Sequence, residues 1–196
     1  MAAQRSGGGR ANALKGELTA RLEESTSAPA EAVYDLLADV GSHLEWAGTR
    51  QPKKSYRLLS IEGPEGPAGV GTEFTSTGAD AMGRFADSSV VTEASRPGLF
   101  EFVTEARLTT KRDVVVEWTL VHRYEIKPEG SGCRIVYDVR IVRLSPTPGA
   151  LALFTMPGLR SVLMRIGASY SRKGLRNLVR MAEERSRMSR AAALEG

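Results

Sequence analysis

The stretch Ser25–Trp46, STSAPAEAVYDLLADVGSHLEW, decides the fold that this sequence predicts. Pro29 suits the first turn of a helix, and apolar residues recur at helical spacing from Val33 to Val40. Gly41 predicts the end of that helix. A second short helix is expected to follow and to end at the tryptophan. Two short helices so early in a chain need a partner surface, and the rest of the sequence has to supply it.

Strand patterns flank this stretch on both sides. Leu18, Ala20 and Leu22 alternate with polar residues, which is strand periodicity. Residues 53–144 read as about six more strands joined by short turns, which is typical of an antiparallel meander. Residues 155–188 carry an amphipathic helical stripe. The predicted fold class is therefore α+β: a curved antiparallel sheet of about seven strands wrapped around one long C-terminal helix, because one helix cannot cover a flat sheet of that width.

Length and composition predict a single domain. The chain has 196 residues, and we expect the domain to span 17–188, with flexible tails at 1–16 and 189–196. No apolar run is long enough for a membrane span, and the first residues have no apolar signal-peptide core. Cys133 is the single cysteine, which excludes an internal disulfide. These features favour a cytoplasmic location.

Residues 25–46 resemble the start of the START-like (SRPBCC) superfamily, in particular its polyketide cyclase/dehydrase-like branch. The resemblance rests on Pro29, Ala30, Val33, Asp39 and Trp46. GVGTEF at 69–74 is similar to that family's glycine-rich entry into the third strand, and RKGLRNLVRMAEE at 172–184 is similar to its closing helix.

The resemblance implies a helix-grip fold with a cavity between the sheet and the long helix. Members of the superfamily bind lipids, polyketides, hormones or other hydrophobic molecules there, and some catalyse cyclisation or dehydration. The first hypothesis is therefore hydrophobic small-molecule binding without catalysis. The second is a polyketide cyclase/dehydrase-like enzyme that uses cavity histidine and tyrosine side chains as acid and base. The third is an interaction module that uses the basic C-terminal helix.

The last predicted hairpin identifies candidate cavity residues. If KPEGSG at 127–132 is the turn, His122 faces Tyr137, Tyr124 faces Ile135, and one face of the hairpin is almost wholly apolar. Phe100 and Phe102 share the matching parity on the preceding strand. The candidate ligand-binding residues are Trp46, Phe100, Phe102, Trp118, His122, Tyr124, Tyr137, Leu163, Gly167 and Tyr170.

The catalytic candidates are His122, Tyr137 and Tyr170. His122 could be a polar contact or an acid–base group near a bound carbonyl, a core histidine hydrogen-bonded to a tyrosine hydroxyl, or a solvated residue near the cavity mouth. Tyr170 lies on the same helix face as Gly167 and Gly174, where missing side chains could leave room for a ligand or permit close packing. Trp46 could line the cavity or form the core of the plug made by the short helices.

Other chemistries lack support in the sequence. Cys133 is predicted to lie too far from His122 along the hairpin for a nucleophile–base pair. Asp35 and Asp39 have no partner at metal-ligand spacing, and we expect neither a metal nor a cofactor. His43, in the second short helix, is expected to be exposed.

Positive charge is concentrated near the C-terminus. Residues 156–190 hold nine Lys/Arg and two acidic residues, in a chain of net charge +4. This segment could contact an anionic membrane, or it could be an ordinary solvated helix face. The apolar stretch Ser145–Ile166 could be a lid over the pocket mouth that also touches the membrane, or a connection that packs onto the sheet. Nucleic-acid binding is not expected, because the segment lacks interleaved aromatic residues. The sequence leaves the oligomeric state open.

Overall fold

The computed structural model describes residues 18–52, 55–145 and 157–195, and within the last range it omits the side chains of 157–164, 166, 194 and 195. Seven antiparallel strands form one curved sheet in the order β1-β7-β6-β5-β4-β3-β2. The strands are β1 (Leu18–Thr26), β2 (Arg57–Glu62), β3 (Glu73–Ala79), β4 (Gly83–Ser95), β5 (Leu99–Thr110), β6 (Val115–Glu129) and β7 (Gly132–Leu144). β1 and β2 are the two edges, so the sheet does not close into a barrel. The predicted seven-stranded α+β fold is confirmed.

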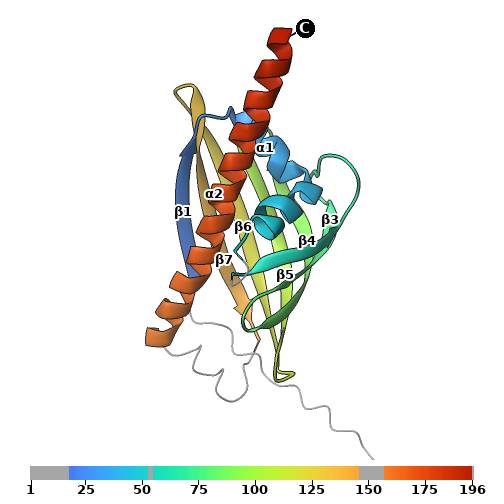
Figure 1. Ribbon diagram of the computed structural model, residues 1–196. Helices are drawn as coiled ribbons and strands as arrows, with labels where there is room; N and C mark the ends of the chain where they lie inside the picture. Colours follow the sequence, from blue (N-terminus) through green and yellow to red (C-terminus); the bar gives the residue numbers. More distant parts are fainter. Residues whose placement is uncertain (1–17, 53–54, 146–156, 196) are drawn as a thin grey trace, which may run out of the picture.

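The described residues also form four helical segments. The helix α1 (Ala30–Ala38), the 3₁₀-helix η1 (Val40–Ser42) and the π-helical turn η2 (Leu44–Thr49) follow β1, and the long helix α2 (Pro157–Glu195) follows the sheet. α2 runs across the open side of the curved sheet beside β1 (Figure 1). It continues through 189–195, which the sequence suggested as a tail. No helix in the described ranges is long and apolar enough to cross a membrane.

The end of α1 is fixed by the residues that follow it. Ser42 Oγ donates a hydrogen bond to the carbonyl of Leu36 at 2.7 Å, and His43 Nε2 donates to the carbonyl of Leu37 at 2.8 Å. These side chains satisfy carbonyls that a helix C-terminus otherwise leaves without partners. His43 is 4% exposed. The expectation that His43 is exposed was therefore wrong, because its ring turns inward to cap the helix.

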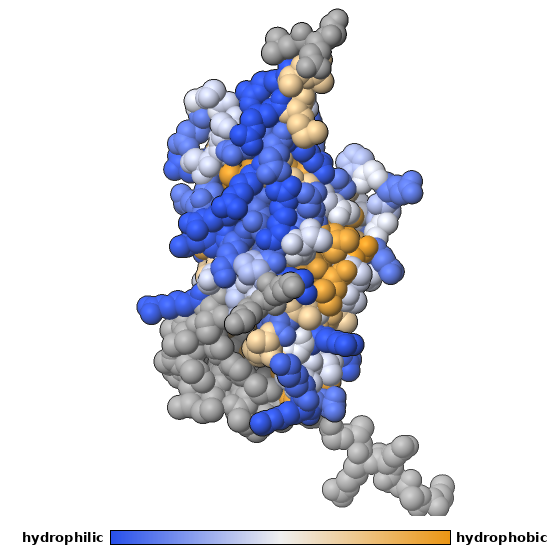
Figure 2. All heavy atoms as spheres, viewed as in Figure 1, coloured by the Kyte–Doolittle hydropathy of each residue, from blue (hydrophilic) through white to orange (hydrophobic). Residues whose placement is uncertain are grey.

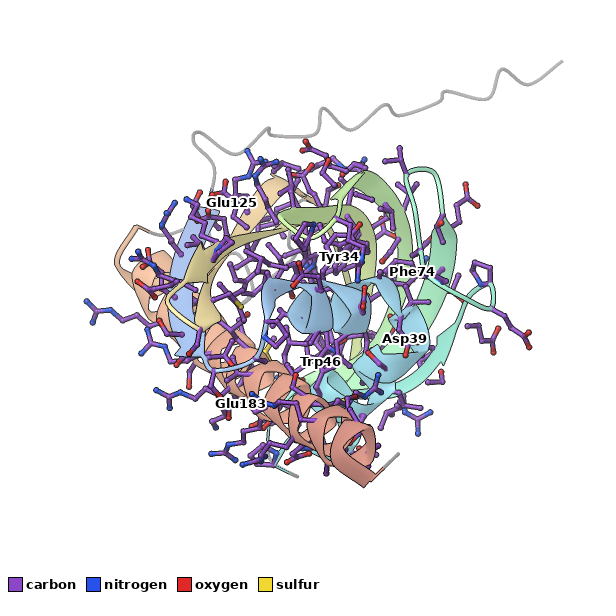
Figure 3. All side chains as sticks on the ribbon, turned by 90° about the horizontal axis from the view of Figure 1, so that it is seen from above. Tyr34, Asp39, Trp46, Phe74, Glu125 and Glu183 are labelled. Atoms are coloured by element: carbon purple, nitrogen blue, oxygen red, sulfur yellow. The ribbon has the colours of Figure 1, made fainter. Side chains whose placement is uncertain are left out.

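The short helices plug one end of the sheet. Figure 3 looks down this end and shows α1 lying across the opening between the curved sheet and α2. Val33, Leu36 and Leu37 are fully buried there. Tyr34 meets Phe100 of β5 edge to face, with ring centroids 5.9 Å apart. Burial of this apolar face is what the two short helices contribute to the fold.

α2 joins the plug to the sheet through both apolar and polar contacts. Leu175, Leu178 and Met181 are almost completely buried. Asn177 Nδ2 donates to the carbonyls of Trp46 at 3.0 Å and Arg50 at 3.2 Å, which holds η2 against the helix. The exposed side of α2 is hydrophilic (Figure 2).

The register of the last hairpin differs from the prediction by two residues. Tyr124 lies opposite Tyr137, and His122 lies opposite Val139. The reason is a tighter turn than expected: Glu129 pairs with Gly132, so Gly130 and the next residue form the loop, with φ of +59° at Gly130. A shift of two residues keeps every side chain on its predicted face.

Candidate functional site

A cavity of about 370 Å³ lies between the concave face of the sheet and α2. Its size falls in the range of small-molecule sites. Strands β3 to β7, the residues around β2, the short helices and α2 all contribute to its wall. The aromatic residues in that wall are His43, Trp46, Tyr56, Phe74, Phe85, Phe102, Trp118, His122, Tyr124, Tyr137 and Tyr170.

Most of the sequence-predicted site residues lie in this wall. They are Trp46, Phe102, Trp118, His122, Tyr124, Tyr137, Gly167 and Tyr170. Phe100 does not line the cavity; it is completely buried against Tyr34 in the plug. The side chain of Leu163 lies outside the described residues, as does most of the proposed lid at 145–166. That these side chains bind a ligand stays a prediction.

His122 and Tyr137 are joined by a hydrogen bond in the cavity wall. His122 Nδ1 lies 2.7 Å from the Tyr137 hydroxyl, and the His122 ring stacks on Phe102 with centroids 4.6 Å apart. Burial, and then the nearby His43, lowers the pKa of His122 to about 4. His122 is therefore neutral at physiological pH.

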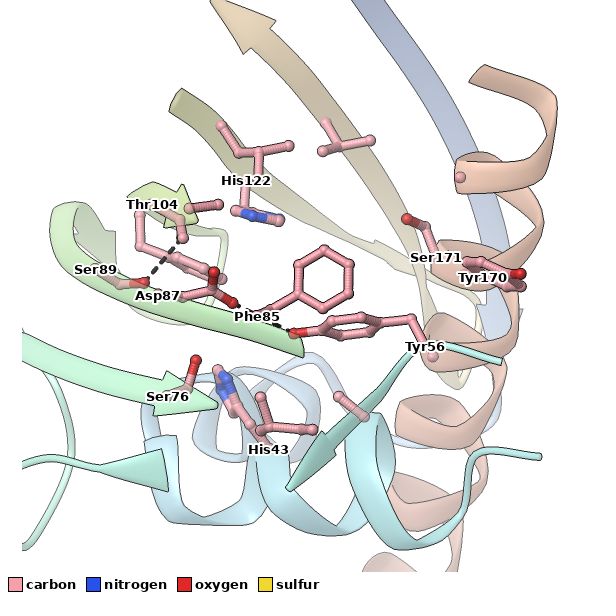
Figure 4. Close-up of a pocket in the computed structure, with 18 of the residues that line it drawn as sticks. His43, Tyr56, Ser76, Phe85, Asp87, Ser89, Thr104, His122, Tyr170 and Ser171 are labelled. Carbon is pink, nitrogen blue, oxygen red and sulfur yellow. Dashed lines mark hydrogen bonds between the residues drawn. The ribbon is translucent and has the colours of Figure 1, made fainter. Parts of the chain in front are cut away.

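The hydroxyl of Tyr137 interacts with two further hydroxyl groups. Burial raises the pKa of Tyr137 to about 12, and hydrogen bonds from Tyr124 and from Ser171 of α2 partly oppose that rise. We expect the Tyr137 hydroxyl to donate its one proton to His122 Nδ1 at this short distance. The neutral imidazole then carries its own proton on Nε2. This ring points into the cavity (Figure 4), where Nε2–H can donate to a ligand.

The sequence reasoning missed a second polar pair in the cavity, formed by Tyr56 and Asp87. The Tyr56 hydroxyl donates to Asp87 Oδ2 at 3.4 Å (Figure 4). Burial raises the pKa of Asp87 to about 6, and the hydrogen bond from Tyr56 partly opposes it. Burial, and next the Asp87 carboxylate, raises the pKa of Tyr56 well above its ordinary value. Asp87 therefore changes protonation state close to neutral pH.

Asp87 could have been found from the pattern of its strand. Phe85, Asp87, Ser89 and Val91 share one parity on β4, and Phe85 and Val91 mark that face as the inner one. Ser89 confirms that this face of β4 is directed toward the cavity, because its hydroxyl lies 2.8 Å from the hydroxyl of Thr104 in the cavity wall. An acidic residue at an inward position of a strand is a signal for a polar site.

The two helix glycines have different surroundings. A Cβ atom at Gly167 would meet no atom of the described residues within 4 Å, and Gly167 lies in the cavity wall. A Cβ atom at Gly174 would lie 3.2 Å from Gln51 Nε2 and 3.7 Å from the Trp46 ring. Gly174 thus permits close packing of α2 on the plug, whereas Gly167 leaves open space beside the cavity.

The remaining polar features of the sequence take structural roles. Cys133 is buried at 1% exposure. Asp35 forms an ion pair with Arg96 at 2.8 Å, and Asp39 Oδ1 accepts the backbone N–H of Ser42 at 3.3 Å. Within the described ranges, no three His, Cys, Asp or Glu side chains are grouped as a metal site would require.

Comparisons with known proteins show the fold. No protein-family model and no curated protein matches the sequence. Among solved structures, the chain is similar to a protein of unknown function from Staphylococcus aureus, with a TM-score of 0.61, 8% identity, and coverage of 88% of this chain and 97% of that one. A Thermus thermophilus protein has a TM-score of 0.59 at 16% identity, covering 86% and 99%. Ara h 8.0201 has a TM-score of 0.51 at 13% identity, covering 83% and 99%. This chain therefore has a fold of the helix-grip type.

Proposed function

We propose that this protein binds a hydrophobic small molecule in the cavity between the sheet and α2. The observation that carries the proposal is the cavity itself: about 370 Å³, walled mainly by aromatic and aliphatic side chains, with a few polar groups. Apolar walls supply affinity, and a small number of polar groups orients the ligand. The resemblance to the START-like superfamily supports the same conclusion and favours lipids or polyketides as the ligand class.

The polar groups of the cavity are held in place before a ligand arrives. Tyr137 fixes His122 from one side, and Phe102 stacks on its other side. The side chains of Ser89 and Thr104 are hydrogen-bonded to each other, as are those of Tyr56 and Asp87. Such preorganisation lowers the entropic cost of binding.

The test uses a tryptophan in the open space beside Gly167. Gly167→Trp should fill part of the cavity, because a Cβ atom there meets no atom within 4 Å in the part of the chain that the structure describes. Titration with the neutral dye Nile red should show saturable binding to the wild type and at least tenfold weaker binding to the variant. Ser169→Trp is the matched control, because Ser169 is an exposed residue of the same helix and does not line the cavity. Equal dye binding by all three proteins would contradict the proposal.

A second candidate is an acid–base enzyme of the polyketide cyclase/dehydrase-like kind. It is favoured by one observation: Asp87, with a pKa of about 6, shares the cavity with His122 and Tyr137. A carboxyl group with a pKa near the working pH is suited to proton transfer. Tyr170, the remaining catalytic candidate from the sequence, also lines the cavity. It is only partly buried, and the Lys173 ammonium lies 6.0 Å from its ring centroid. Conversion of a bound poly-β-ketone by the wild type, with loss of turnover in Asp87→Asn, would establish this function.

A further inference from the structure

The charge of the cavity wall is opposite in sign to that of the protein. The chain has a net charge of +4. Among the described residues that line the cavity, however, the charged side chains are Asp80 and Asp87, with no lysine or arginine. Burial lowers the pKa of both lining histidines, His43 and His122, to about 4, so they add no positive charge at neutral pH.

Asp80 is already committed to the local backbone. Its Oδ1 accepts hydrogen bonds from the N–H groups of Met82 at 2.7 Å and Gly83 at 3.2 Å, in the turn between β3 and β4. Asp87, in contrast, stands in the middle of β4, opposite Ser76 of β3 and Ala106 of β5. It is the acidic side chain in this wall that remains available to a ligand.

The carboxylate of Asp87 is incompletely satisfied by the protein. Its Oδ2 accepts the Tyr56 hydroxyl at 3.4 Å, which is longer than an ordinary O–H···O bond. Its Oδ1 is buried and has no partner of ordinary hydrogen-bond geometry among the described residues, although the backbone N–H of Arg107 on β5 partly stabilises the carboxylate. A buried carboxylate with so few hydrogen bonds is strongly stabilised by a hydrogen-bond donor or a positive charge that another molecule supplies.

Aromatic rings stand next to this carboxylate. Phe85 precedes Asp87 by two residues on the same face of β4 and meets Tyr56 at 5.1 Å and Trp118 at 5.9 Å between ring centroids. The Tyr56 ring lies against Gly78 of β3, where a Cβ atom would approach it to 2.8 Å. The absence of a side chain at Gly78 is thus what lets Tyr56 reach Asp87. Aromatic faces attract ammonium groups, and a carboxylate beside them adds to that attraction.

We infer that the ligand of this cavity is a hydrophobic amine, whose ammonium group pairs with Asp87 while its apolar part packs against the aromatic wall around Phe85. This inference rests on the proposed function, because it names the chemical class of the molecule bound in the same cavity. A fatty acid or another anionic ligand would place its charge beside Asp87 and be repelled. The inference therefore separates this protein from carriers of anionic lipids.

Three probes of nearly equal shape test the sign of the preferred charge: phenylbutylamine, phenylbutanol and phenylbutyrate. Their binding to the full-length protein is measured by isothermal titration calorimetry at pH 8. At this pH Asp87 is ionised, since its pKa is about 6, and the amine is protonated. We expect phenylbutylamine to bind at least tenfold more tightly than phenylbutanol, and phenylbutyrate to bind most weakly.

Two isosteric variants show whether Asp87 is responsible. Asp87→Asn should weaken phenylbutylamine binding about tenfold and leave phenylbutanol binding within about threefold. Asp113→Asn removes the same charge from the exposed turn between β5 and β6, where φ of 58° suits asparagine, and should change neither. An unchanged thermal unfolding profile confirms that each variant is folded.

The outcomes separate the two proposals. Binding of phenylbutanol with equal or weaker binding of the amine would overturn the amine inference and support the hydrophobic-ligand function alone. An equal loss of amine affinity in Asp87→Asn and Asp113→Asn would also overturn it, because the effect would then be one of net charge. Absence of binding by all three probes would overturn the proposed function together with this inference.

Discussion

The hydroxyl of Tyr137 lies 2.7 Å from Nδ1 of His122, although the two residues are not directly opposite each other in the sheet. Tyr137 is paired with Tyr124, and the two rings stack with centroids 4.3 Å apart. The contact with His122 is therefore a diagonal one between neighbouring strands, which long aromatic side chains can span. It orients a neutral imidazole at the wall of the cavity.

We expect both histidines of the chain to stay neutral at pH values far below the ordinary pKa of histidine. Burial lowers the pKa of His43 and of His122 from 6.5 to about 4. Because the folded protein binds fewer protons than the unfolded chain between these values, the stability that the neutral rings provide is lost as the pH falls from 6.5 through 4. Nitrogen-15 NMR of the two imidazoles should show Nε2–H tautomers at pH 7 and midpoints near 4.

Tyr137→Phe is the control for this titration. It removes the hydroxyl that fixes His122 but leaves the hydrogen bond from His43 to Leu37 unchanged. The tautomer signal of His122 should change and that of His43 should not. A midpoint near 6.5 for His122 in the wild type would show that its ring is solvated and would contradict the buried arrangement.

His122→Ala should leave the fold intact and weaken binding of a ligand that accepts a hydrogen bond. The Tyr137 hydroxyl keeps Tyr124 and Ser171 as partners, and a water molecule in the space left by the imidazole can accept the proton that His122 Nδ1 accepted. Loss of one neutral hydrogen bond corresponds to about 1 kcal/mol, or roughly fivefold in affinity. Benzylacetone, which has a carbonyl group, should lose this much affinity, whereas butylbenzene, which has none, should not. Unchanged affinity for both in a folded variant would remove His122 from the site.

Asp87→Asn should stabilise the ligand-free protein at pH 7 but not at pH 4. Since burial raises the pKa of Asp87 from 3.8 to about 6, the folded state binds more protons than the unfolded chain between these values, and stability falls as the pH rises through that window. The shift corresponds to at most about 3 kcal/mol, reduced by partial solvent exposure. Tyr56, Asp80, His43 and His122 face the same cavity and are unchanged in the variant.

Urea unfolding of both proteins at pH 4 and at pH 7 measures this effect. The stability difference between the variant and the wild type should grow with pH. An equal stability difference at both pH values would mean that burial does not raise the pKa of Asp87. A lower stability of the variant at pH 7 would mean that the carboxylate has a favourable partner in the folded protein.

Alanine at the two helix glycines should have different effects. Gly167→Ala should raise the free energy of unfolding by about 0.5 to 1 kcal/mol, because alanine favours the helix and the new methyl group meets open space. Gly174→Ala should gain less or lose stability, because its methyl group would lie 3.2 Å from Gln51 Nε2. Denaturant unfolding of both variants checks this. A larger gain at Gly174 than at Gly167 would contradict the close packing of α2 on the plug.

The sequence predicted the fold well because its signals were local or periodic. Alternation in strands, helical spacing after Pro29 and the long amphipathic stripe each follow from which side of an element is buried. Parity also placed Phe102, Trp118 and Tyr124 on the inner face. Parity could not exclude Phe100 from the cavity, since the plug and the cavity occupy different ends of the same sheet face.

Features that depend on long-range contacts were not predictable in this way. His43 turns inward because a carbonyl of α1 needs a donor, and the sequence alone does not show that geometry. Tyr56 reaches Asp87 only because Gly78 has no side chain on the neighbouring strand. The hairpin register depended on whether the turn began at Lys127 or at Gly130, and a shift of two residues leaves the apolar pattern unchanged. Membrane contact by the basic helix and the 145–166 segment stays a prediction.

The most direct measurement follows the two tryptophan indole N–H signals in a ¹H–¹⁵N NMR titration with phenylbutanol. The chain has two tryptophans, Trp46 and Trp118, and both line the cavity, one on η2 and one on β6. If a hydrophobic molecule binds there, both signals should shift along saturating curves that give one dissociation constant. If one or both signals do not shift up to the solubility limit of phenylbutanol, the result would contradict binding of a hydrophobic molecule in this cavity.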